Sequence, residues 1–402
     1  MQLRRKTNKI SKLTAFFEWR IYMKIIADEN IPFVKKCFST IGDVVTISGR
    51  DITASAVRDA DILLVRSITT VDEGLLAESS VKFVATATIG FEHIDADVLN
   101  RRNIGFASAP GSNANSVAEY VTAALLEIAE KNNIVLADKS IGIIGVGNVG
   151  SRVEKKCRAL GMKVLLNDPP LFRKTGNQKY LPIEKLFDCD FLTLHTPLTF
   201  KGIDKTYHLA DYKFFDSVKK GCVFINTARG PVMNSQALKD KIKAGIVKAA
   251  VLDVWENEPD IDTELLELAD IATAHIAGYS LDGKVAGLIM IYSAACDYLG
   301  VKAASTAGDF LPKPKVPALK IEAEDNEQQI LHSLVPQIYD IKKDDQALRK
   351  LLKLPADKKA AWFDRLRKEY PERREFSNTK VAVKNAGEGL IEKIKGIGFQ
   401  AK

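Results

Sequence analysis

The stretch Ser140–Gly150, SIGIIGVGNVG, decides the fold because it joins a short apolar run to a G-x-G-x-x-G pattern. An apolar run of this length, bounded by glycine, predicts a buried strand, and the segment 151–160 that follows predicts a helix. A second strand-sized run, KVLLND at 163–168, comes next. A strand, a glycine turn, a helix and a second strand in this order are typical of a dinucleotide-binding βαβ unit.

The glycines of this unit have distinct physical tasks. Gly145 allows the tight turn, Gly147 lets the backbone approach a pyrophosphate, and Gly150 lets the helix pack closely on the strand. Asp168 lies eighteen residues after Gly150, where its carboxylate can accept hydrogen bonds from both ribose hydroxyls and repel a 2′-phosphate. The pattern therefore predicts NAD rather than NADP. The alternative is a structural glycine turn followed by a surface aspartate.

Outward from this unit, apolar runs of strand length alternate with polar segments that can form helices. Such alternation predicts an α/β protein whose parallel sheets are covered by helices on both faces. The expected strands are 23–28, 61–66, 81–85, 140–145, 163–168, 190–195, 222–226, 249–253 and 270–274.

Two features predict domain boundaries. Ser116 and Glu119 form an S-x-x-E capping box ahead of apolar residues at helical spacing, which predicts a helix that bridges two domains. Pro312, Pro314 and Pro317 stand where neither a helix nor a central strand can continue. We therefore expect a basic leader at 1–22, a substrate-binding domain formed by 23–115 with 279–302, an NAD-binding domain at 116–278, and a C-terminal domain at 303–402.

Composition excludes several classes of protein. With 46% apolar and 27% charged residues, the chain of 402 residues is expected to be globular rather than disordered. No apolar run approaches the roughly 18–20 residues that span a bilayer, so neither an integral membrane protein nor a membrane partner is expected. The five cysteines are scattered without a C-x-x-C pair, which argues against disulfides or a zinc cage and fits a reducing, cytoplasmic compartment.

The net charge of +7 is unevenly distributed. Residues 1–22 carry six basic side chains and one acid, residues 303–402 carry 20 and 15, and the remaining 280 residues carry 32 and 35, a net of −3. The body is therefore mildly acidic, and no nucleic-acid groove is expected. We expect the leader to be disordered or to precede the true start at Met23; an organellar transit peptide is the alternative.

Three strand-sized runs each end in a residue able to do acid–base or anion chemistry. Arg229 follows 222–226, Glu258 follows 249–253, and His275 follows 270–274. Open α/β sheets bind their ligands at this carboxyl end of the strands. A structural Arg–Glu salt bridge and a packed histidine are the alternatives. No histidine–carboxylate cluster has metal-ligand spacing, so no metal is expected.

The spacing of these residues, 29 from Arg229 to Glu258 and 17 from Glu258 to His275, resembles that of the NAD-dependent D-isomer-specific 2-hydroxyacid dehydrogenases. Within them, the chain is similar to the erythronate-4-phosphate dehydrogenase family of vitamin B6 synthesis. The similarity rests on MKIIADENIP from Met23, ATATIGFEHID from Ala85, VLDVWENEP, AHIAGYS, and the tail segments YDIKKDD and FDRLRKEYPERREF. It covers about residue 23 to the end. Ser112 stands where many relatives have a cysteine, and Thr227-Ala228 varies the strand-end sequence.

The resemblance implies NAD-dependent oxidation of 4-phospho-D-erythronate. It implies two doubly wound domains, one Rossmann-type and one flavodoxin-like, and a C-terminal α+β domain that forms a homodimer. His275 would take the hydroxyl proton, Glu258 would orient its ring, and Arg229 would bind the substrate carboxylate. The implied cofactor contacts are Gly145, Gly147, Asn148, Val149, Gly150, Asp168, Thr196, Thr227, Ala228, Arg229, Asp253 and Gly278, and the implied substrate contacts are Ser67, Thr88, Arg229 and Tyr279.

Other interpretations stay open. The substrate could be 3-phosphoglycerate or an unphosphorylated hydroxy acid, and the chain could be an NAD-sensing, non-catalytic protein related to corepressors. We expect His93, His208 and His332 to be structural or surface residues and His195 to lie near the cofactor. The residues that bind the substrate phosphate are not fixed by the pattern. Candidates are Arg66 beside Ser67 and the tail residues Arg365, Arg367, Arg373 and Arg374, although the tail run favours a solvated helix face.

Overall fold

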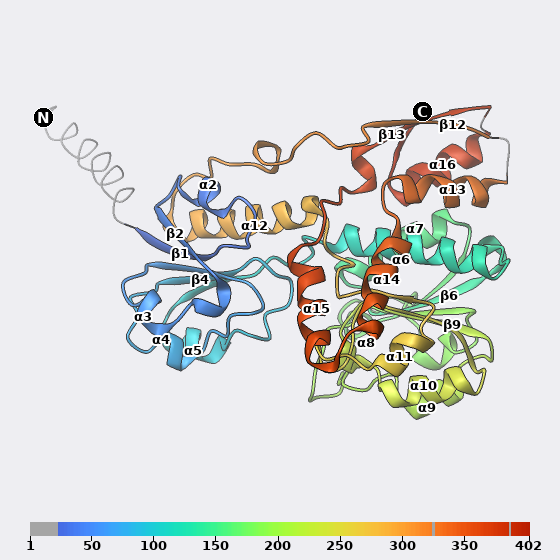
Figure 1. The fold of residues 1–402 in the computed structure, drawn as a ribbon, viewed down its shortest axis with the longest axis horizontal. Helices are drawn as coiled ribbons and strands as arrows, with labels where there is room; N and C mark the ends of the chain where they lie inside the picture. The colour runs from blue at the N-terminus through green and yellow to red at the C-terminus, as the bar shows by residue number, and fades with distance from the viewer. Residues whose placement is uncertain (1–22, 324–325, 386) are drawn as a thin grey trace, which may run out of the picture. The chain divides into compact units, whose positions relative to one another are not determined.

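The computed structural model describes residues 23–323, 326–385 and 387–402 (Figure 1). The predictions for the leader 1–22 lie outside the described residues. The described chain forms two compact units, each considered by itself. Unit 1 contains the residues up to Asn113 together with Asp282–Pro312, and unit 2 contains Ala114–Leu281 together with Lys313–Lys402.

Unit 1 is built on a parallel sheet of five strands in the order β2-β1-β3-β4-β5. Its central strands carry the apolar runs ILLV and FVAT, and all eight of these residues are buried, as expected for strands covered on both faces. The strands are β1 Lys24–Asp28, β2 Asp43–Ile47, β3 Ile62–Val65, β4 Phe83–Thr86 and β5 Gly105–Ala107. The helices include α2 Val34–Phe38, α3 Ala54–Val57, α4 Glu73–Leu76, α5 Ala96–Arg101 and α12 Leu281–Leu299.

Unit 2 contains a parallel sheet of six strands in the order β11-β10-β9-β8-β6-β7. The strand order reverses at β6, which carries the glycine pattern at its end, and this is where doubly wound sheets bind dinucleotides. The strands are β6 Ser140–Ile144, β7 Lys163–Asn167, β8 Phe191–Leu194, β9 Cys222–Asn226, β10 Val247–Leu252 and β11 Ile271–Ala272. The helices are α6 Ala114–Lys131, α7 Asn148–Ala159, α8 Pro169–Thr175, α9 Tyr212–Ser217, α10 Ser235–Lys243 and α11 Thr263–Leu268. The predicted α/β class is confirmed.

The predicted capping box at Ser116 is wrong. Helix α6 begins two residues earlier, at Ala114, and both Ser116 and Glu119 are fully buried within it. Their side chains bond to distant residues instead of to the helix end: Ser116 Oγ lies 2.7 Å from Glu375 Oε1, and Glu119 Oε1 accepts the Phe376 N–H at 3.0 Å. Each side chain therefore has a partner more than 250 residues away, and Glu119 Oε1 also accepts from Asn115 Nδ2 of the same helix at 3.0 Å.

The C-terminal segment packs on helices α6 and α7 and on the β11 edge of the six-stranded sheet. Its helices are α13 Glu327–Leu334, α14 Ile341–Arg349, α15 Ala356–Lys368 and α16 Glu388–Ile397, and its parallel sheet has the order β12-β13-β14, with β12 Ala318–Glu322, β13 Lys380–Lys384 and β14 Gln400–Ala401. Helices α13 and α16 lie against α6 and α7 (Figure 1), and Leu331, Phe376 and Ile394 belong to the same buried cluster as Val121. This shared core explains why Lys313–Lys402 group with Ala114–Leu281 in unit 2. The prediction of a C-terminal domain at 303–402 stays a prediction.

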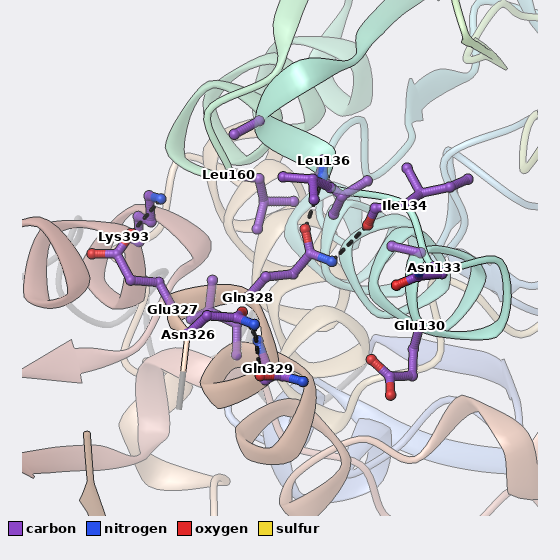
Figure 2. Close-up of a pocket in the computed structure, with 14 residues that line it drawn as sticks. Glu130, Asn133, Ile134, Leu136, Leu160, Asn326, Glu327, Gln328, Gln329 and Lys393 are labelled. Atoms are coloured by element: carbon purple, nitrogen blue, oxygen red, sulfur yellow. Dashed lines mark hydrogen bonds and ion pairs between the residues drawn. The ribbon is translucent and has the colours of Figure 1, made fainter. Parts of the chain in front are cut away.

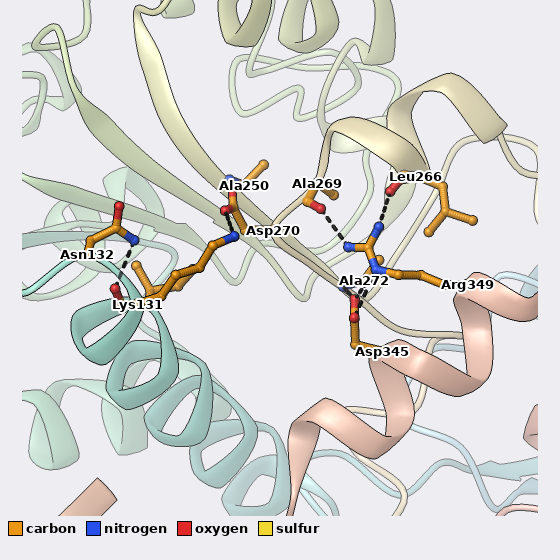
Figure 3. A network of polar contacts seen from close by, with 10 residues as sticks. Lys131, Asn132, Ala250, Leu266, Ala269, Asp270, Ala272, Asp345 and Arg349 are labelled. Atoms are coloured by element: carbon orange, nitrogen blue, oxygen red, sulfur yellow. Dashed lines mark hydrogen bonds and ion pairs between the residues drawn. The ribbon is translucent and has the colours of Figure 1, made fainter. Parts of the chain in front are cut away.

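Helix α14 covers the β11 edge of the six-stranded sheet (Figure 3). The Arg349 guanidinium donates to the Leu266 and Ala269 carbonyls at 2.9 and 2.6 Å, at the end of α11. Asp345 Oδ1 accepts the Ala272 N–H at 2.8 Å. An edge strand otherwise leaves such groups unpaired, so α14 fixes the short strand that leads into His275.

Two further searches of the described residues bear on function. No helix in that part of the chain combines the length and apolar character that crossing a bilayer requires. The same residues contain no group of three or more His, Cys, Asp or Glu side chains able to hold a metal ion. All five cysteines are buried and free.

Candidate active site

The predicted site residues of unit 2 follow the carboxyl ends of its parallel strands. Because all six strands run the same way, the loops after them meet at one edge of the sheet. The glycine turn follows β6, Asp168 follows β7, and His195 and Thr196 follow β8. Thr227–Arg229 follow β9, Asp253 and Glu258 follow β10, and His275–Tyr279 follow β11.

The glycine turn has the geometry that its spacing predicts. A Cβ at Gly150 would lie 2.0 Å from the Gly145 carbonyl oxygen, so only glycine lets helix α7 begin this close to the strand. A Cβ at Gly147, by contrast, would meet no atom within 4 Å. The space in front of the α7 N-terminus is therefore open on the side where a pyrophosphate would bind.

Asp168 has two structural tasks at this edge. Its Oδ2 accepts the Val146 N–H at 2.7 Å, which ties β7 to the glycine turn, and its Oδ1 accepts the Leu171 N–H at 2.9 Å, which caps helix α8. Each carboxylate oxygen can accept a further hydrogen bond. The contact with the ribose hydroxyls stays a prediction.

His275 and Glu258 form the central pair of the site. His275 Nδ1 lies 2.7 Å from Glu258 Oε2, and Glu258 Oε1 accepts the Trp255 N–H at 2.8 Å. Burial alone would raise the pKa of Glu258, yet the charges of His275 and Arg367 and these hydrogen bonds hold that pKa below its usual range. The carboxylate is therefore ionised and can only accept, so Nδ1 carries the ring proton and Nε2 is left as a base.

The loop that carries His275 is held by Asp253. His275 has a φ of 56°, in the left-handed region that is unusual for a non-glycine residue. The His275 N–H donates to the Asp253 carbonyl at 2.7 Å, and the Asp253 carboxylate accepts the N–H groups of Ile276 and Ala277 at 2.7 and 3.0 Å. Asp253 is 1% exposed and positions this loop, and its implied contact with the cofactor stays a prediction.

Arg229 lies on a turn locked against the loop of Glu258. A Cβ at Gly230 would lie 1.9 Å from the Trp255 carbonyl oxygen, so the two loops touch through bare backbone. The Asn226 side chain closes the turn, because its Oδ1 accepts the Ala228 N–H at 3.0 Å and its Nδ2 donates to the Arg229 carbonyl at 3.1 Å. Gly230 and Asn226 are structural residues of the site that sequence reasoning did not single out.

Thr196, Thr227 and His195 line the same edge. His195 bonds to Thr193 Oγ1 at 3.0 Å and to Thr227 Oγ1 at 3.2 Å, and burial lowers the pKa of its ring to about 3, so the ring is neutral. Thr196 Oγ1 is buried and has no hydrogen-bond partner among the described residues. Thr196 lies beside Gly145 of the glycine turn, because a Cβ at Gly145 would come within 2.9 Å of the Thr196 backbone nitrogen. A buried hydroxyl without a partner at this turn fits the polar groups of a dinucleotide.

The remaining predicted residues fall in both units. Gly278 and Tyr279 directly follow the His275 loop, and Tyr279 meets the Tyr370 ring edge-on at 5.7 Å between centroids. Ser67 and Thr88 belong to unit 1, after the ends of β3 and β4. Thr88 Oγ1 donates to the Gly90 carbonyl at 2.9 Å, whereas Ser67 is exposed.

Residues of the C-terminal segment bind the backbone of the His275 loop. The sequence predicted that the arginines of this segment lie on a solvated helix face, and for Arg373 and Arg374 that prediction is wrong. Arg373 and Arg374 are 5% and 7% exposed, and they lie after the end of α15. Arg373 Nη2 donates to the carbonyls of Ala277 and Ser116, each at 2.8 Å. Arg373 is buried where the backbone of α6 and of the His275 loop offers carbonyls for it to bind, and Arg374 donates to Asn378 Oδ1 at 2.8 Å.

A second histidine–glutamate pair was not foreseen. His208 Nε2 lies 2.7 Å from Glu256 Oε1, and Glu256 Oε2 accepts the Ser235 N–H at 2.8 Å. His332 also pairs with a carboxylate, that of Glu127 at 3.2 Å, and His93 bonds to Thr86 Oγ1 at 3.1 Å. Partners 48 and 205 residues apart leave no local pattern from which the first two pairs could be read.

A groove of about 610 Å³ lies elsewhere in unit 2, between the end of α6 and α13 (Figure 2). Gln328 bridges its walls, because its Nε2 donates to the Ile134 carbonyl and its Oε1 accepts the Leu136 N–H, both at 2.8 Å. None of the predicted site residues lines this groove. We therefore interpret it as a gap in the packing between the C-terminal segment and α6.

Comparison with known sequences agrees with this geometry. Residues 118–277 match the model of the D-isomer specific 2-hydroxyacid dehydrogenase NAD binding domain, and residues 310–398 match a model described as a domain of unknown function. The chain is 42% identical over 377 residues to erythronate-4-phosphate dehydrogenase of Hahella chejuensis, covering 94% of this chain and 99% of that protein. It is also 42% identical to the enzyme of Klebsiella pneumoniae, covering 94% and 98%.

Solved structures show the same fold. The chain is similar to the TT0316 protein from Thermus thermophilus, with a TM-score of 0.61 at 21% identity, covering 70% of this chain and 99% of that one. It is also similar to NAD⁺-bound 3-phosphoglycerate dehydrogenase of Entamoeba histolytica, with a TM-score of 0.60 at 25% identity, covering 71% and 98%. With an NAD-binding domain and relatives matched over nearly their whole length, the chain belongs to the erythronate-4-phosphate dehydrogenase family of NAD-dependent 2-hydroxyacid dehydrogenases.

Proposed function

We propose that this chain oxidises 4-phospho-D-erythronate to (R)-3-hydroxy-2-oxo-4-phosphooxybutanoate with NAD, as a step in the synthesis of pyridoxal 5′-phosphate. The observation that carries the proposal is the 2.7 Å pair of His275 Nδ1 and Glu258 Oε2, on the same sheet edge as the glycine turn. The relatives named above for this reaction support the choice of substrate.

His275 Nε2 accepts the proton of the C2 hydroxyl as the C2 hydride leaves. Glu258 keeps the ring in the tautomer that can do so and stabilises the imidazolium that forms. Arg229 binds the substrate carboxylate through a planar, always charged guanidinium. The glycine turn, Asp168 and Thr196 would hold NAD, which would supply the hydride acceptor.

The experiment follows reduced cofactor by its absorbance, with purified protein, NAD and erythronate 4-phosphate. His275→Gln is expected to lower kcat by about 10²- to 10⁴-fold, the usual contribution of a general base, while NAD still binds. His208→Gln is the matched control, because it removes the other histidine of a 2.7 Å carboxylate pair. A wild-type protein that prefers 3-phosphoglycerate, or an active His275→Gln variant, contradicts the proposal.

We also infer a cytoplasmic homodimer formed through the C-terminal segment 313–402. Buried, unpaired cysteines fit a reducing compartment. Strand β12 lies at the edge of its sheet, which is a common site of pairing between chains.

A further inference from the structure

The proposed substrate carries two anionic groups, and only one has a binding residue so far. Arg229 accounts for the carboxylate, whereas the phosphate, with a charge of about −1.5 to −2 at neutral pH, has none. The sequence offered five arginines for this role: Arg66, Arg365, Arg367, Arg373 and Arg374. The contacts of each guanidinium in the structure show which of these arginines is suited to bind the phosphate.

Four of the five already use their guanidinium groups in structural contacts. Arg66 Nε binds the fully buried Asp28 carboxylate at 3.0 Å, and Arg365 forms an exposed ion pair with Glu369 at 2.8 Å. Arg373 donates to two backbone carbonyls through Nη2 alone, and its Nε and Nη1 are buried without a hydrogen-bond partner among the described residues. Arg374 donates to Asn378 Oδ1 at 2.8 Å. Moving Arg66, Arg373 or Arg374 to a ligand would break a contact within the fold, whereas the ion pair of Arg365 is exposed and contributes little stability.

Arg367 differs from the other four because its guanidinium lies near two residues of the site, Tyr279 and Glu258. It lies on α15, and its guanidinium is 5.9 Å from the centre of the Tyr279 ring and hydrogen-bonded to that residue. It is also close enough to Glu258 for its charge to lower the pKa of that carboxyl. Its Nε is buried without a hydrogen-bond partner among the described residues, a costly state for a charged group.

We propose that Arg367 binds the phosphate of the substrate, beside Tyr279, and thereby selects a 4-phosphorylated hydroxy acid over its unphosphorylated analogue. The inference rests on the proposed function and adds a specificity residue to it. A guanidinium matches the geometry of a phosphate. The buried Nε of Arg367, which has no partner among the described residues, would gain a hydrogen-bond acceptor when the phosphate binds. The C-terminal segment is then part of the active site of its own chain.

The test compares Arg367→Met with Arg365→Met, a matched change on the same helix at an exposed ion pair. Each variant is assayed with erythronate 4-phosphate and with unphosphorylated D-erythronate. We expect Arg367→Met to raise KM for the phosphorylated acid about 10- to 100-fold, the range for a lost charge-assisted hydrogen bond, and to lower the ratio of kcat/KM between the two acids by the same factor. Arg365→Met should leave this ratio within about 2-fold of wild type.

Equal losses of kcat/KM on both acids would leave the ratio between the acids unchanged and would overturn the proposal. Arg367 would then act only by positioning Glu258. Arg367→Lys, which keeps the charge but loses the planar fork, should recover part of the ratio. If the wild type oxidises neither acid, the proposed function fails, and the role of Arg367 is decided by calorimetric titration with inorganic phosphate in the presence of NAD. Loss of phosphate binding in Arg367→Met but not in Arg365→Met supports an anion site, and equal binding overturns it.

Discussion

At the scale of single residues, Gly147 and Gly150 show how two glycines of one pattern answer to different constraints. A methyl group at 150 would collide with the Gly145 carbonyl, whereas one at 147 would project into open space. Gly150→Ala should therefore destabilise the protein by at least about 1–3 kcal/mol, as overpacking does. Gly147→Ala should change its stability by less than about 1 kcal/mol and instead weaken NAD binding.

Thermal unfolding with and without NAD distinguishes the two effects, because a ligand raises the unfolding temperature only of a protein that binds it. We expect a lowered midpoint for Gly150→Ala in both conditions. For Gly147→Ala we expect a normal midpoint without NAD and a reduced rise with it. A full rise for Gly147→Ala would contradict the assignment of this space to the pyrophosphate.

At the scale of elements, the contact of α6 and α7 with the tail buries charge. Glu119 of α6 is completely buried, and burial raises the pKa of its carboxyl to about 8, although Lys156 of α7 lowers it in part. A carboxyl whose pKa is raised on folding contributes stability that is fully present below its unfolded pKa of about 4.5 and is lost as pH rises through about 8. Between these values the folded protein holds a proton that the unfolded chain has released.

Glu119→Gln removes this titration and keeps the acceptor oxygen that Phe376 uses. We expect the unfolding temperature of the wild type to fall relative to Glu119→Gln as pH rises from about 5 to 8.5, by roughly 2–4 °C for each kcal/mol lost. Glu130→Gln, on an exposed position of the same helix, serves as the control. A constant difference across this pH range would show that Glu119 does not titrate as stated.

The same elements show how far the sequence could predict the structure. The central strands were predicted closely, since ILLV at β3 is apolar throughout and CVFIN at β9 is apolar up to its last residue, Asn226. The edge strand β2 was missed because only one of its five residues is buried. The site residues Arg229, Glu258 and His275 could be predicted because each follows a strand. Ser116, Glu119 and Arg373 were misread because each binds a partner that lies 96 to 259 residues away in the chain, and no local pattern encodes those contacts.

At the scale of the whole molecule, the proposed dimer is directly testable. One chain has a mass of 44.3 kDa, so size-exclusion chromatography with light scattering should give about twice this value. A charged substitution on the β12 edge, such as Leu319→Lys, should shift the protein toward the monomer, because an inward charge blocks strand pairing. A wild-type mass of one chain would contradict the homodimer.

The contact of Arg373 with Ala277 also governs when the site can form during synthesis. Arg373 emerges from the ribosome 96 residues after Ala277, which at roughly 5–20 residues per second takes about 5 to 20 seconds. Through this interval the His275 loop lacks the guanidinium that binds its carbonyl, and β11 lacks Asp345, which binds the Ala272 N–H. Catalytic competence is therefore gained only near the end of translation, and a nascent chain stalled before residue 373 should be inactive even with every catalytic residue already made.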